Sequence, residues 1–308
     1  MTAIRIGTRG SPLALRQVDE VAERLAALAD CPVEVVPIKT SGDRLAQVSL
    51  ADFGGKGLFA KEIEEALLAS QVDLGVHSLK DLPTELPPAL CLAAFLPREA
   101  PHDVLVSTHG GTLADLPSGA IVGTSSLRRR VLLRLHRPDL RIEPIRGNLD
   151  TRLRKLREGA YDALVLAAAG LRRLGLSPEG AQVLAPEEFI PAVGQGIVAV
   201  EARADHARVL ELLRGLDHTE TRWQALAERA FLRRLGAGCY TPVAAHARQV
   251  KGALSVVGFV ASPDAERSIR GEASGTLEAA ELLGQKLAED LDARGASEIL
   301  REIDRGRG

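Results

Sequence analysis

The chain has 308 residues, of which 45% are hydrophobic and 26% charged, and its formal net charge is −2 at pH 7. This composition is ordinary for a globular protein, and the length predicts two or three domains rather than one. The longest nearly apolar run, residues 163–171, is far too short to span a bilayer, which argues against an integral membrane protein.

The first residues pass directly from Met1 into the strand-like run 4–6, with no charged segment followed by an apolar one. We therefore expect no secretory signal. The three cysteines, Cys31, Cys91 and Cys239, are widely spaced and odd in number, which is not typical of a disulfide framework or a metal site. These features predict a cytoplasmic protein without a bound metal.

Three short patterns occur twice, in the same order, within the first two hundred residues. A β run ending in Gly-Thr, followed by a serine that begins a helical pattern, covers 6–11 and 122–126; Pro-Ile-Lys/Arg covers 37–39 and 144–146; an apolar run with an early aspartate covers 72–76 and 161–165. The repeats predict two similar α/β lobes, each built around a mainly parallel sheet. Binding sites in such sheets lie at the carboxyl ends of the strands, so two facing lobes would clamp a ligand in a cleft.

A glycine-rich stretch, residues 41–59, precedes a predicted helix over 61–69. Such a stretch is either a surface loop or a lid over the cleft. Both interpretations stay open from the sequence alone.

The most unusual feature is a cluster of arginines between Gly123 and Arg173. This window holds twelve arginines and one lysine against five acidic residues, a formal charge of +8 within a nearly neutral chain. So cationic a segment indicates an anionic partner, and guanidinium groups bind carboxylates or phosphates with two hydrogen bonds. Nucleic acid is the less favoured partner, because aromatic residues make up only 3% of the chain.

The last third predicts a small α+β domain. Apolar residues at helical spacing follow Thr219, Gly236 is a suitable helix stop, three strand-like runs cover 242–246, 253–261 and 268–272, and an amphipathic helix follows. A further short helix is expected over 204–216. Cys239 stands among small residues just past the first of these helices, which favours a reactive or derivatised thiol over a buried one. A nucleophilic pair with His246 is a further possibility.

Lys80 and Asp81 follow a buried β run at 72–76. An exposed Lys-Asp pair is usually only a solvated turn. At a strand end facing many arginines, however, Asp81 would stay ionised and could stabilise a positive intermediate or accept a proton.

Taken together, these segments closely resemble the porphobilinogen deaminase family over nearly the whole chain. The matching motifs are residues 9–15, 54–59, 76–83, 122–129, 145–152, 169–175 and 191–196. The sequence departs from the family at Ala237, where glycine is usual and where a methyl group is tolerated unless φ is positive, and at Arg16, where an apolar aromatic residue is common.

The resemblance implies two periplasmic-binding-protein-like (type II) α/β lobes forming a cleft, plus a small C-terminal α+β domain. The implied boundaries are residues 1–98 with 194–217 for the first lobe, 99–193 for the second and 218–308 for the C-terminal domain. It also implies a monomeric transferase of tetrapyrrole biosynthesis, which deaminates four porphobilinogen molecules, joins them head to tail on a dipyrromethane primer and releases hydroxymethylbilane. The primer would be attached through a thioether to Cys239.

Motif by motif, the resemblance implies the following site. Asp81 is the catalytic residue. The cofactor-binding residues are Cys239, Lys80, Asp81, Thr124, Ser126, Arg128, Arg129, Arg146 and Gly147. The substrate-binding residues are Arg9, Ser11, Arg146, Arg152, Arg173 and Gln195. Every added pyrrole brings an acetate and a propionate, which accounts for the many arginines.

Two other functions remain alternatives. A non-catalytic two-lobed binder of a small dicarboxylate would need neither Cys239 nor Asp81. An RNA-binding protein would use the arginines and would show a steep salt dependence.

Overall fold

The computed structural model describes residues 3–28, 32–44, 57–238 and 241–305. They form two compact units, Met1–Glu99 with Gly196–Arg222 and Ala100–Gln195 with Trp223–Gly308. The division into three domains stays a prediction. Cys239 and residues 45–56 of the glycine-rich stretch lie outside the described residues.

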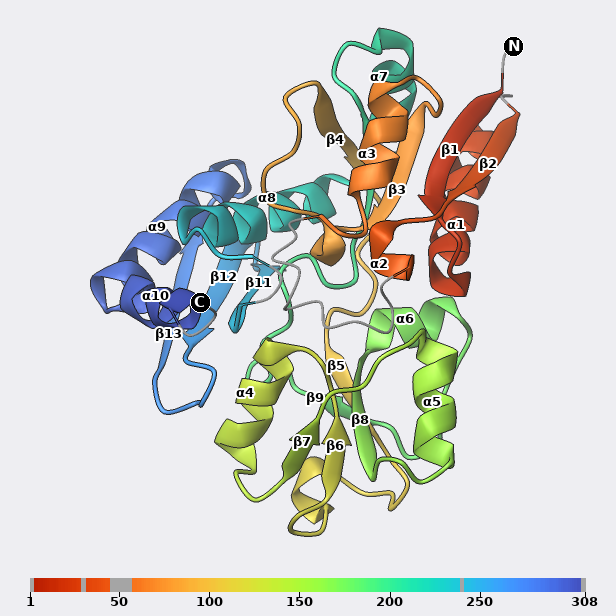
Figure 1. Ribbon diagram of the computed structural model, residues 1–308. Coiled ribbons are helices and arrows are strands. Elements are labelled where there is room, and N and C mark those ends of the chain that lie inside the picture. Colours follow the sequence, from red (N-terminus) through yellow and green to blue (C-terminus); the bar gives the residue numbers. More distant parts are fainter. Residues whose placement is uncertain (1–2, 29–31, 45–56, 239–240, 306–308) are drawn as a thin grey trace. The chain divides into compact units, whose positions relative to one another are not determined.

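The first unit contains a five-stranded sheet in the order β2-β1-β3-β10-β4 (Figure 1). Strands β1, β2 and β3 are parallel, whereas β10 runs antiparallel to both β3 and β4. The strands are β1 Ile4–Arg9, β2 Val33–Ile38, β3 Leu74–Ser78, β4 Leu90–Phe95 and β10 Val198–Arg203. The expectation of a mainly parallel sheet is confirmed, with one strand returning in the opposite direction.

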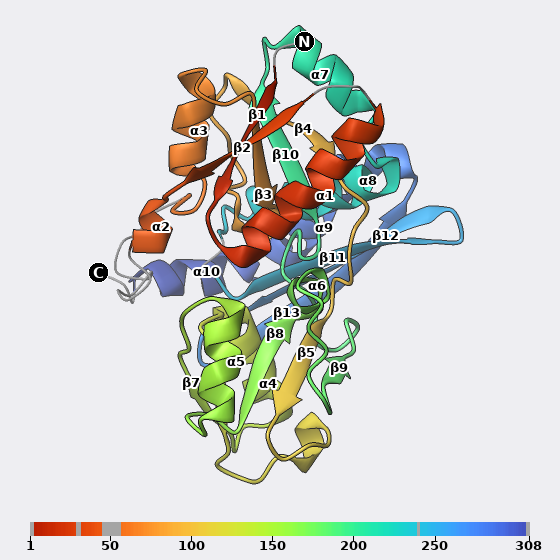
Figure 2. The same ribbon diagram turned by 90° about the vertical axis from the view of Figure 1, so that its right-hand side faces the viewer.

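Helices cover both faces of this sheet. Helix α1, Pro12–Leu28, presents Val18, Val21 and Leu25 to one face, and α7, Ala207–Arg214, packs on the same side. Figure 2 shows α1 lying across the strands. Helix α3, Lys61–Leu68, packs with β2 and β4 residues in a separate cluster. The short helix α2, Ser41–Arg44, precedes it.

The second unit contains a five-stranded sheet in the order β7-β6-β8-β5-β9. Its first three strands follow the same pattern as β2-β1-β3, and its last two take the places of β10 and β4. Strands β6, β7 and β8 are parallel, and β5 runs antiparallel to β8 and β9. The strands are β5 Asp103–Ser107, β6 Ile121–Gly123, β7 Arg141–Glu143, β8 Ala163–Ala167 and β9 Gln182–Leu184. Each strand therefore has a counterpart in the first sheet, which confirms the two similar lobes predicted from the repeats. One detail differs: β7 ends at Glu143, so residues 144–146 follow the strand instead of completing it.

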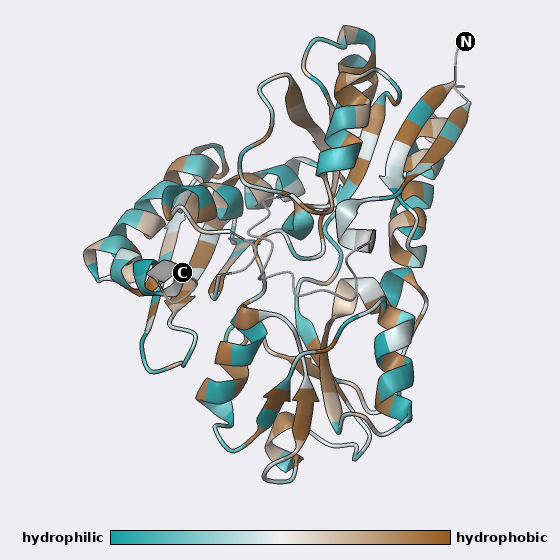
Figure 3. Cartoon of the chain, in the orientation of Figure 1, coloured by the Kyte–Doolittle hydropathy of each residue, from teal (hydrophilic) through white to brown (hydrophobic). Residues whose placement is uncertain are grey.

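Helix α4, Leu127–His136, packs its apolar residues against β6 and β8 on one face of this sheet. Helices α5, Leu149–Arg157, and α6, Ala168–Arg173, contribute Leu156 and Leu171 to a cluster with alternate residues of β5 and β8. Figure 3 shows hydrophobic residues concentrated in strands β5 to β8 and hydrophilic residues along much of α5. This contrast is that of a buried sheet covered by amphipathic helices.

The second unit also holds a three-stranded antiparallel sheet, β11 Val243–Val250, β12 Ala253–Ala261 and β13 Ser268–Gly275. Helices α8, Thr219–Arg234, α9, Ala280–Ala293, and α10, Ala296–Arg305, share one apolar cluster with it. All three predicted strands are therefore confirmed, and α10 was not expected. Gly236 ends α8 with φ of 64°, as predicted.

None of the described helices is both long enough and apolar enough to cross a membrane. Within the same described ranges, no group of three or more His, Cys, Asp or Glu side chains is arranged to hold a metal ion.

Candidate functional site

In the first unit, predicted site residues gather where β1 and β3 end. Arg9 is the last residue of β1, and Ser11 begins α1 by accepting a hydrogen bond at Oγ from the Ala14 N–H at 3.3 Å. Strand β3 ends at Ser78 and leads into a turn of 3-10 helix, Leu79–Asp81, which carries Lys80 and Asp81. Parallel strands end at the same edge of a sheet, and this brings the two motifs together.

A pocket lies at this edge, lined by Arg9, Ser11, Gln17, Phe59, Ser78 and Asp81 among others. The guanidinium carbon of Arg9 lies 4.1 Å from the centroid of the Phe59 ring, a cation–π contact. Gln17 Nε2 donates to Ser78 Oγ at 2.8 Å. The pocket thus contains a cation, a carboxylate and hydroxyl groups, a mixture that suits a small zwitterionic ligand.

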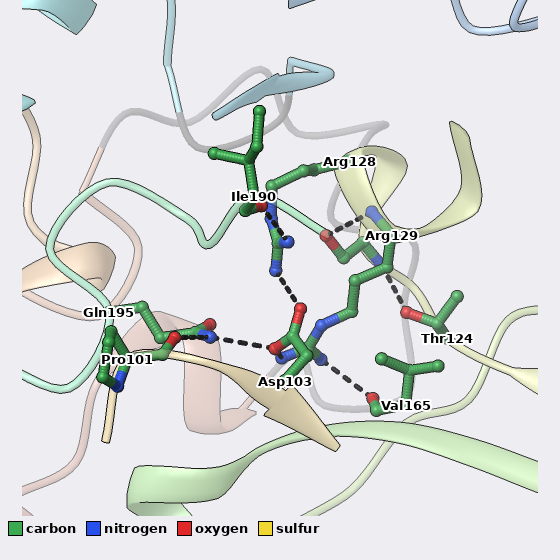
Figure 4. Close-up of polar contacts among 9 residues, drawn as sticks. Pro101, Asp103, Thr124, Arg128, Arg129, Val165, Ile190 and Gln195 are labelled. Carbon is green, nitrogen blue, oxygen red and sulfur yellow. Dashed lines mark hydrogen bonds and ion pairs between the residues drawn. The ribbon is translucent and has the colours of Figure 1, made fainter. Parts of the chain in front are cut away.

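In the second unit, the corresponding turn holds two buried arginines (Figure 4). Arg128 and Arg129 follow Ser126, whose hydroxyl caps α4 by accepting the Arg129 N–H at 3.4 Å. The two side chains are 4% and 9% exposed. Such burial is rare for arginine and requires acceptors close by.

One carboxylate, Asp103 at the start of β5, provides the main acceptors. Its Oδ2 accepts from Arg128 Nη2 at 2.8 Å and its Oδ1 from Arg129 Nη2 at 2.7 Å. Asp103 is fully buried, and burial alone would raise its pKa. The charges and hydrogen bonds of the two arginines instead hold the pKa of Asp103 well below its usual range, so the carboxylate is ionised.

Backbone carbonyls complete part of the arginine environment. Arg128 Nη1 donates to Ile190 O at 2.7 Å, and Arg129 Nη1 donates to Val165 O at 3.0 Å. The Nε–H of each arginine is buried without an acceptor among the described residues. Two guanidinium groups against one carboxylate leave a net charge of +1, so the arginine pair, Arg128 with Arg129, retains both charge and donors for an anion.

Gln195 joins the same cluster. Its Nε2 donates to Pro101 O at 2.6 Å and to Asp103 Oδ1 at 2.9 Å. The predicted substrate ligand Gln195 therefore contacts the carboxylate that orients the arginine pair. Thr124 is also buried, and its Oγ1 accepts the Ser126 N–H at 3.2 Å, which fixes the turn before α4.

The other predicted ligands of the second unit lie near the carboxyl ends of β7 and β8. Gly147 follows Arg146 with φ of 106°, and an added Cβ would lie 2.7 Å from Thr151 Cγ2, so only glycine fits there. Arg152 Nε donates to Gly147 O at 2.8 Å. Arg173 lies in the last turn of α6. Arg146 and Gly147 thus lie just before α5, and Arg152 of α5 contacts Gly147.

Some arginines of the arginine-rich window are neutralised by partners within the second unit. Arg137 binds Asp139 and three backbone carbonyls, and Arg154 pairs with Glu158 along α5. These arginines have structural roles within the second unit. Formal charge counts cannot reveal this, because the neutralising partners are set by the fold.

The sequence analysis did not single out three residues that contact the site or the segments around it. Asp103 binds the arginine pair, Phe59 contacts Arg9, and Glu228 accepts the Gly194 N–H. Asp103 immediately precedes a run of apolar strand residues, and an acid at the start of a buried strand was the available signal. His246, the suggested partner of Cys239, lies on β11 with Nδ1 3.7 Å from Glu228 Oε1. The Cys–His pairing itself falls outside the described residues.

The chain is similar to two family models. Residues 4–211 match the model described as porphobilinogen deaminase, dipyromethane cofactor binding domain, and residues 223–293 match that described as the C-terminal domain. A porphobilinogen deaminase of Syntrophus aciditrophicus is 50% identical over 99% of this chain and 100% of its own length. One of Syntrophomonas wolfei is 47% identical over 98% and 99% of the two chains.

Among solved structures, a putative methionine-binding lipoprotein of Bacillus subtilis is 14% identical with a TM-score of 0.44, covering 71% of this chain and 92% of its own. An arginine-specific periplasmic binding protein of Salmonella typhimurium is 14% identical with a TM-score of 0.40, covering 70% and 92%.

Proposed function

The chain belongs to the porphobilinogen deaminase family, and we propose that it catalyses the reaction for which the family is named. In this reaction four porphobilinogen molecules lose ammonia and are joined head to tail on a dipyrromethane primer, and linear hydroxymethylbilane is released. The observation that carries the proposal is the cofactor-binding domain match over residues 4–211, a range that includes both five-stranded sheets.

The arginine pair fits a cofactor that carries carboxylates. Both arginine side chains are more than nine-tenths buried, and each has a buried Nε–H without an acceptor among the described residues. A buried donor without an acceptor costs about 1–3 kcal/mol, which a bound carboxylate would offset. Bound dipyrromethane supplies a pyrrole with a free α-carbon from which the product chain is extended.

We assign the remaining cofactor contacts to turns that follow strands in each unit. Ser126 and Thr124 lie at the start of α4, where backbone N–H groups and the helix dipole favour an anion. Lys80, Arg146 and Gly147 follow strands of the two sheets. Cys239 would hold the cofactor through a thioether.

Asp81 has a different role in this proposal. Pyrrole nitrogens carry N–H groups, and loss of ammonia leaves a positive charge on the ring that remains. Asp81 would accept hydrogen bonds from the N–H groups and stabilise that charge as it develops. Its place in the pocket with Arg9 supports this role, because the pocket offers a carboxylate for the ring and a cation for the ring's acidic side chains.

Substrate and growing product add two carboxylates with every pyrrole. Arg9, Ser11, Arg146, Arg152, Arg173 and Gln195 are the residues that we propose to bind them. We further propose that the enzyme acts as a cytoplasmic monomer and does not bind nucleic acid.

The test is the intact mass of the purified protein under denaturing conditions. We expect the mass of the sequence plus two deaminated pyrrole units, because only a covalent group survives denaturation. A mass equal to the sequence alone, even after incubation with porphobilinogen, would contradict the proposal. Reversible binding of a small dicarboxylate by such a protein would favour the solute-binding alternative. Tight RNA binding at physiological salt would favour the RNA-binding alternative.

A further inference from the structure

A second buried carboxylate, Glu228 on helix α8, contacts the segment that carries Gln195. Glu228 is 0% exposed. Its Oε2 accepts the Gly194 N–H at 2.6 Å, and its Oε1 accepts the Ala247 N–H of β11 at 2.8 Å. One side chain therefore joins three pieces of backbone: α8, β11 and the segment before β10.

The segment held by Glu228 is connected to the arginine pair in two ways, once through Asp103 and once directly. Gln195, next to Gly194, donates to Asp103, which binds both guanidinium groups. Ile190 O, four residues before Gly194, accepts from Arg128. A shift of this segment would therefore change the acceptors of both arginines.

Packing supports the same connection. Val193 belongs to the apolar cluster of α8, β11 and α9, whereas Ile190 belongs to the cluster of α4, β6 and β8. The segment thus passes from one core to the other within a few residues. Gly194 has φ of 71°, a conformation that glycine adopts without strain.

Glu228 lies on the helix that leads to Cys239, the predicted attachment point of the cofactor. Helix α8 ends at Arg234, five residues before Cys239. Under the proposed function, the cofactor is attached at Cys239 and its carboxylates are bound by Arg128 and Arg129. The attachment point and the carboxylate ligands must then be held at a fixed separation.

We propose that Glu228 is a positioning residue for the cofactor: it fixes the helix that precedes Cys239 to the segment that orients the arginine pair. This inference rests on the proposed function. A carboxylate suits the role, because both of its oxygens accept and each faces a buried N–H donor.

The first test replaces Glu228 with glutamine, which preserves the shape but turns one acceptor into a donor facing an N–H group. We expect apo-protein of the variant to acquire the mass adduct from porphobilinogen about 10-fold to 100-fold more slowly than wild type, as for a small misplacement of reacting groups. Loading is followed by intact mass at a temperature where circular dichroism shows the variant to be folded.

Asp73→Asn is the matched control. Asp73 accepts the Arg5 N–H at 2.9 Å and two guanidinium hydrogen bonds from the same residue, but it precedes the amino end of β3 in the first unit. Loss of the Asp73 charge destabilises the protein but leaves the contacts of the arginine pair unchanged. Asp73→Asn should load at the wild-type rate.

A double-mutant cycle separates positioning from general destabilisation. If Glu228 acts through the Gln195 segment, the losses of loading rate in Glu228→Gln and Gln195→Met should not add, whereas their effects with Asp73→Asn should add. Gly194→Ala strains the same segment while leaving Glu228 in place. It should slow loading in the same way, and it serves as the test if Glu228→Gln does not fold.

A readout independent of loading is the NMR signal of the arginine Nε–H groups. The signals of Arg128 and Arg129 should shift in Glu228→Gln and stay unchanged in Asp73→Asn. Wild-type loading in both Glu228→Gln and Gly194→Ala, additive losses in the cycle, or unshifted Nε–H signals would each overturn the inference. Absence of the adduct from wild type would instead contradict the proposed function, and the NMR comparison would still test the contact.

Discussion

Arg129 Nη2 lies 2.7 Å from Asp103 Oδ1, and the two side chains are 9% and 0% exposed. Removing two charges from water costs several kcal/mol per ion, which a close and well-bonded pair offsets. Here the same carboxylate also binds Arg128, so a single negative charge holds two like charges together. Asp103 is therefore the residue on which the arginine pair depends.

The first prediction follows from this dependence. Asp103→Asn should lower the free energy of unfolding by about 3–5 kcal/mol, the range for removing one partner of a buried ion pair. Urea denaturation with matched slopes measures it. Asp139→Asn, which removes the exposed partner of Arg137, is the control and should change stability far less. Equal effects in the two variants would show that the buried pair is not formed.

The same pair predicts a pH dependence. The pKa of Asp103 is lowered in the folded protein, so its contribution is present above the unfolded pKa of about 3.9 and is lost as the pH falls toward the folded pKa. The difference in unfolding free energy between wild type and Asp103→Asn should be constant from about pH 5 to pH 8 and shrink below about pH 4. A difference that grows in acid would contradict the assigned ionisation.

A third prediction concerns the thiols. The thiolate is the nucleophilic form, and burial together with the negative charge of Glu201 raises the pKa of Cys91. Cys91 should therefore be a poor attachment point. Cys239→Ala should yield folded protein without the mass adduct and without turnover, whereas Cys91→Ala and Cys31→Ala should keep both. Retention of the adduct in Cys239→Ala would place the cofactor elsewhere.

The fourth prediction separates catalysis from binding. Asp81→Asn keeps the shape of the side chain but removes its charge, so the cofactor should stay attached while turnover falls. A loss of about 3–4 kcal/mol of transition-state stabilisation corresponds to roughly a 10²-fold to 10³-fold lower rate. Intact mass and initial rates measure the two effects. Wild-type turnover in this variant would remove Asp81 from the mechanism.

The sequence predicted those parts of the fold that are encoded locally. Ser11 and Ser126 each begin a helix shortly after a strand that ends at or near a Gly-Thr pair, as the repeat indicated. Ala237, the departure from the family pattern, is not among the described non-glycine residues with positive φ, so the methyl group is tolerated there. These features depend on neighbouring residues, which a pattern can show.

Features that depend on distant segments were not predictable in this way. Asp103 and Arg128 are 25 residues apart, and they meet only because β5 returns antiparallel beside β8. Glu228 shows no local sign of its two backbone partners. The last helix was expected to be amphipathic, but which of its leucines are buried depends on packing: α9 buries Leu283, Leu287 and Leu291, whereas Leu282 is 49% exposed.

The last prediction compares arginine variants in the two lobes, which should be impaired at different stages of the reaction. Arg128 belongs to the buried arginine pair, and its replacement by leucine leaves Asp103 with one partner and the cofactor with one fewer ligand. Arg128→Leu should therefore purify mostly without the mass adduct. Arg9 lies instead in the pocket with Asp81, where incoming substrate would bind.

Arg9→Leu should purify with the cofactor attached and then stall during elongation. Incubation with porphobilinogen should give discrete mass steps of one pyrrole unit that persist, because the carboxylates of the growing chain lack a ligand. Phe59→Leu, which removes the ring beneath Arg9 but keeps the charge, should show a weaker form of the same stalling. Uniform, mild losses in Arg9→Leu and Arg128→Leu would mean that the arginines act as a diffuse positive field, and stage-specific ligation would then be wrong.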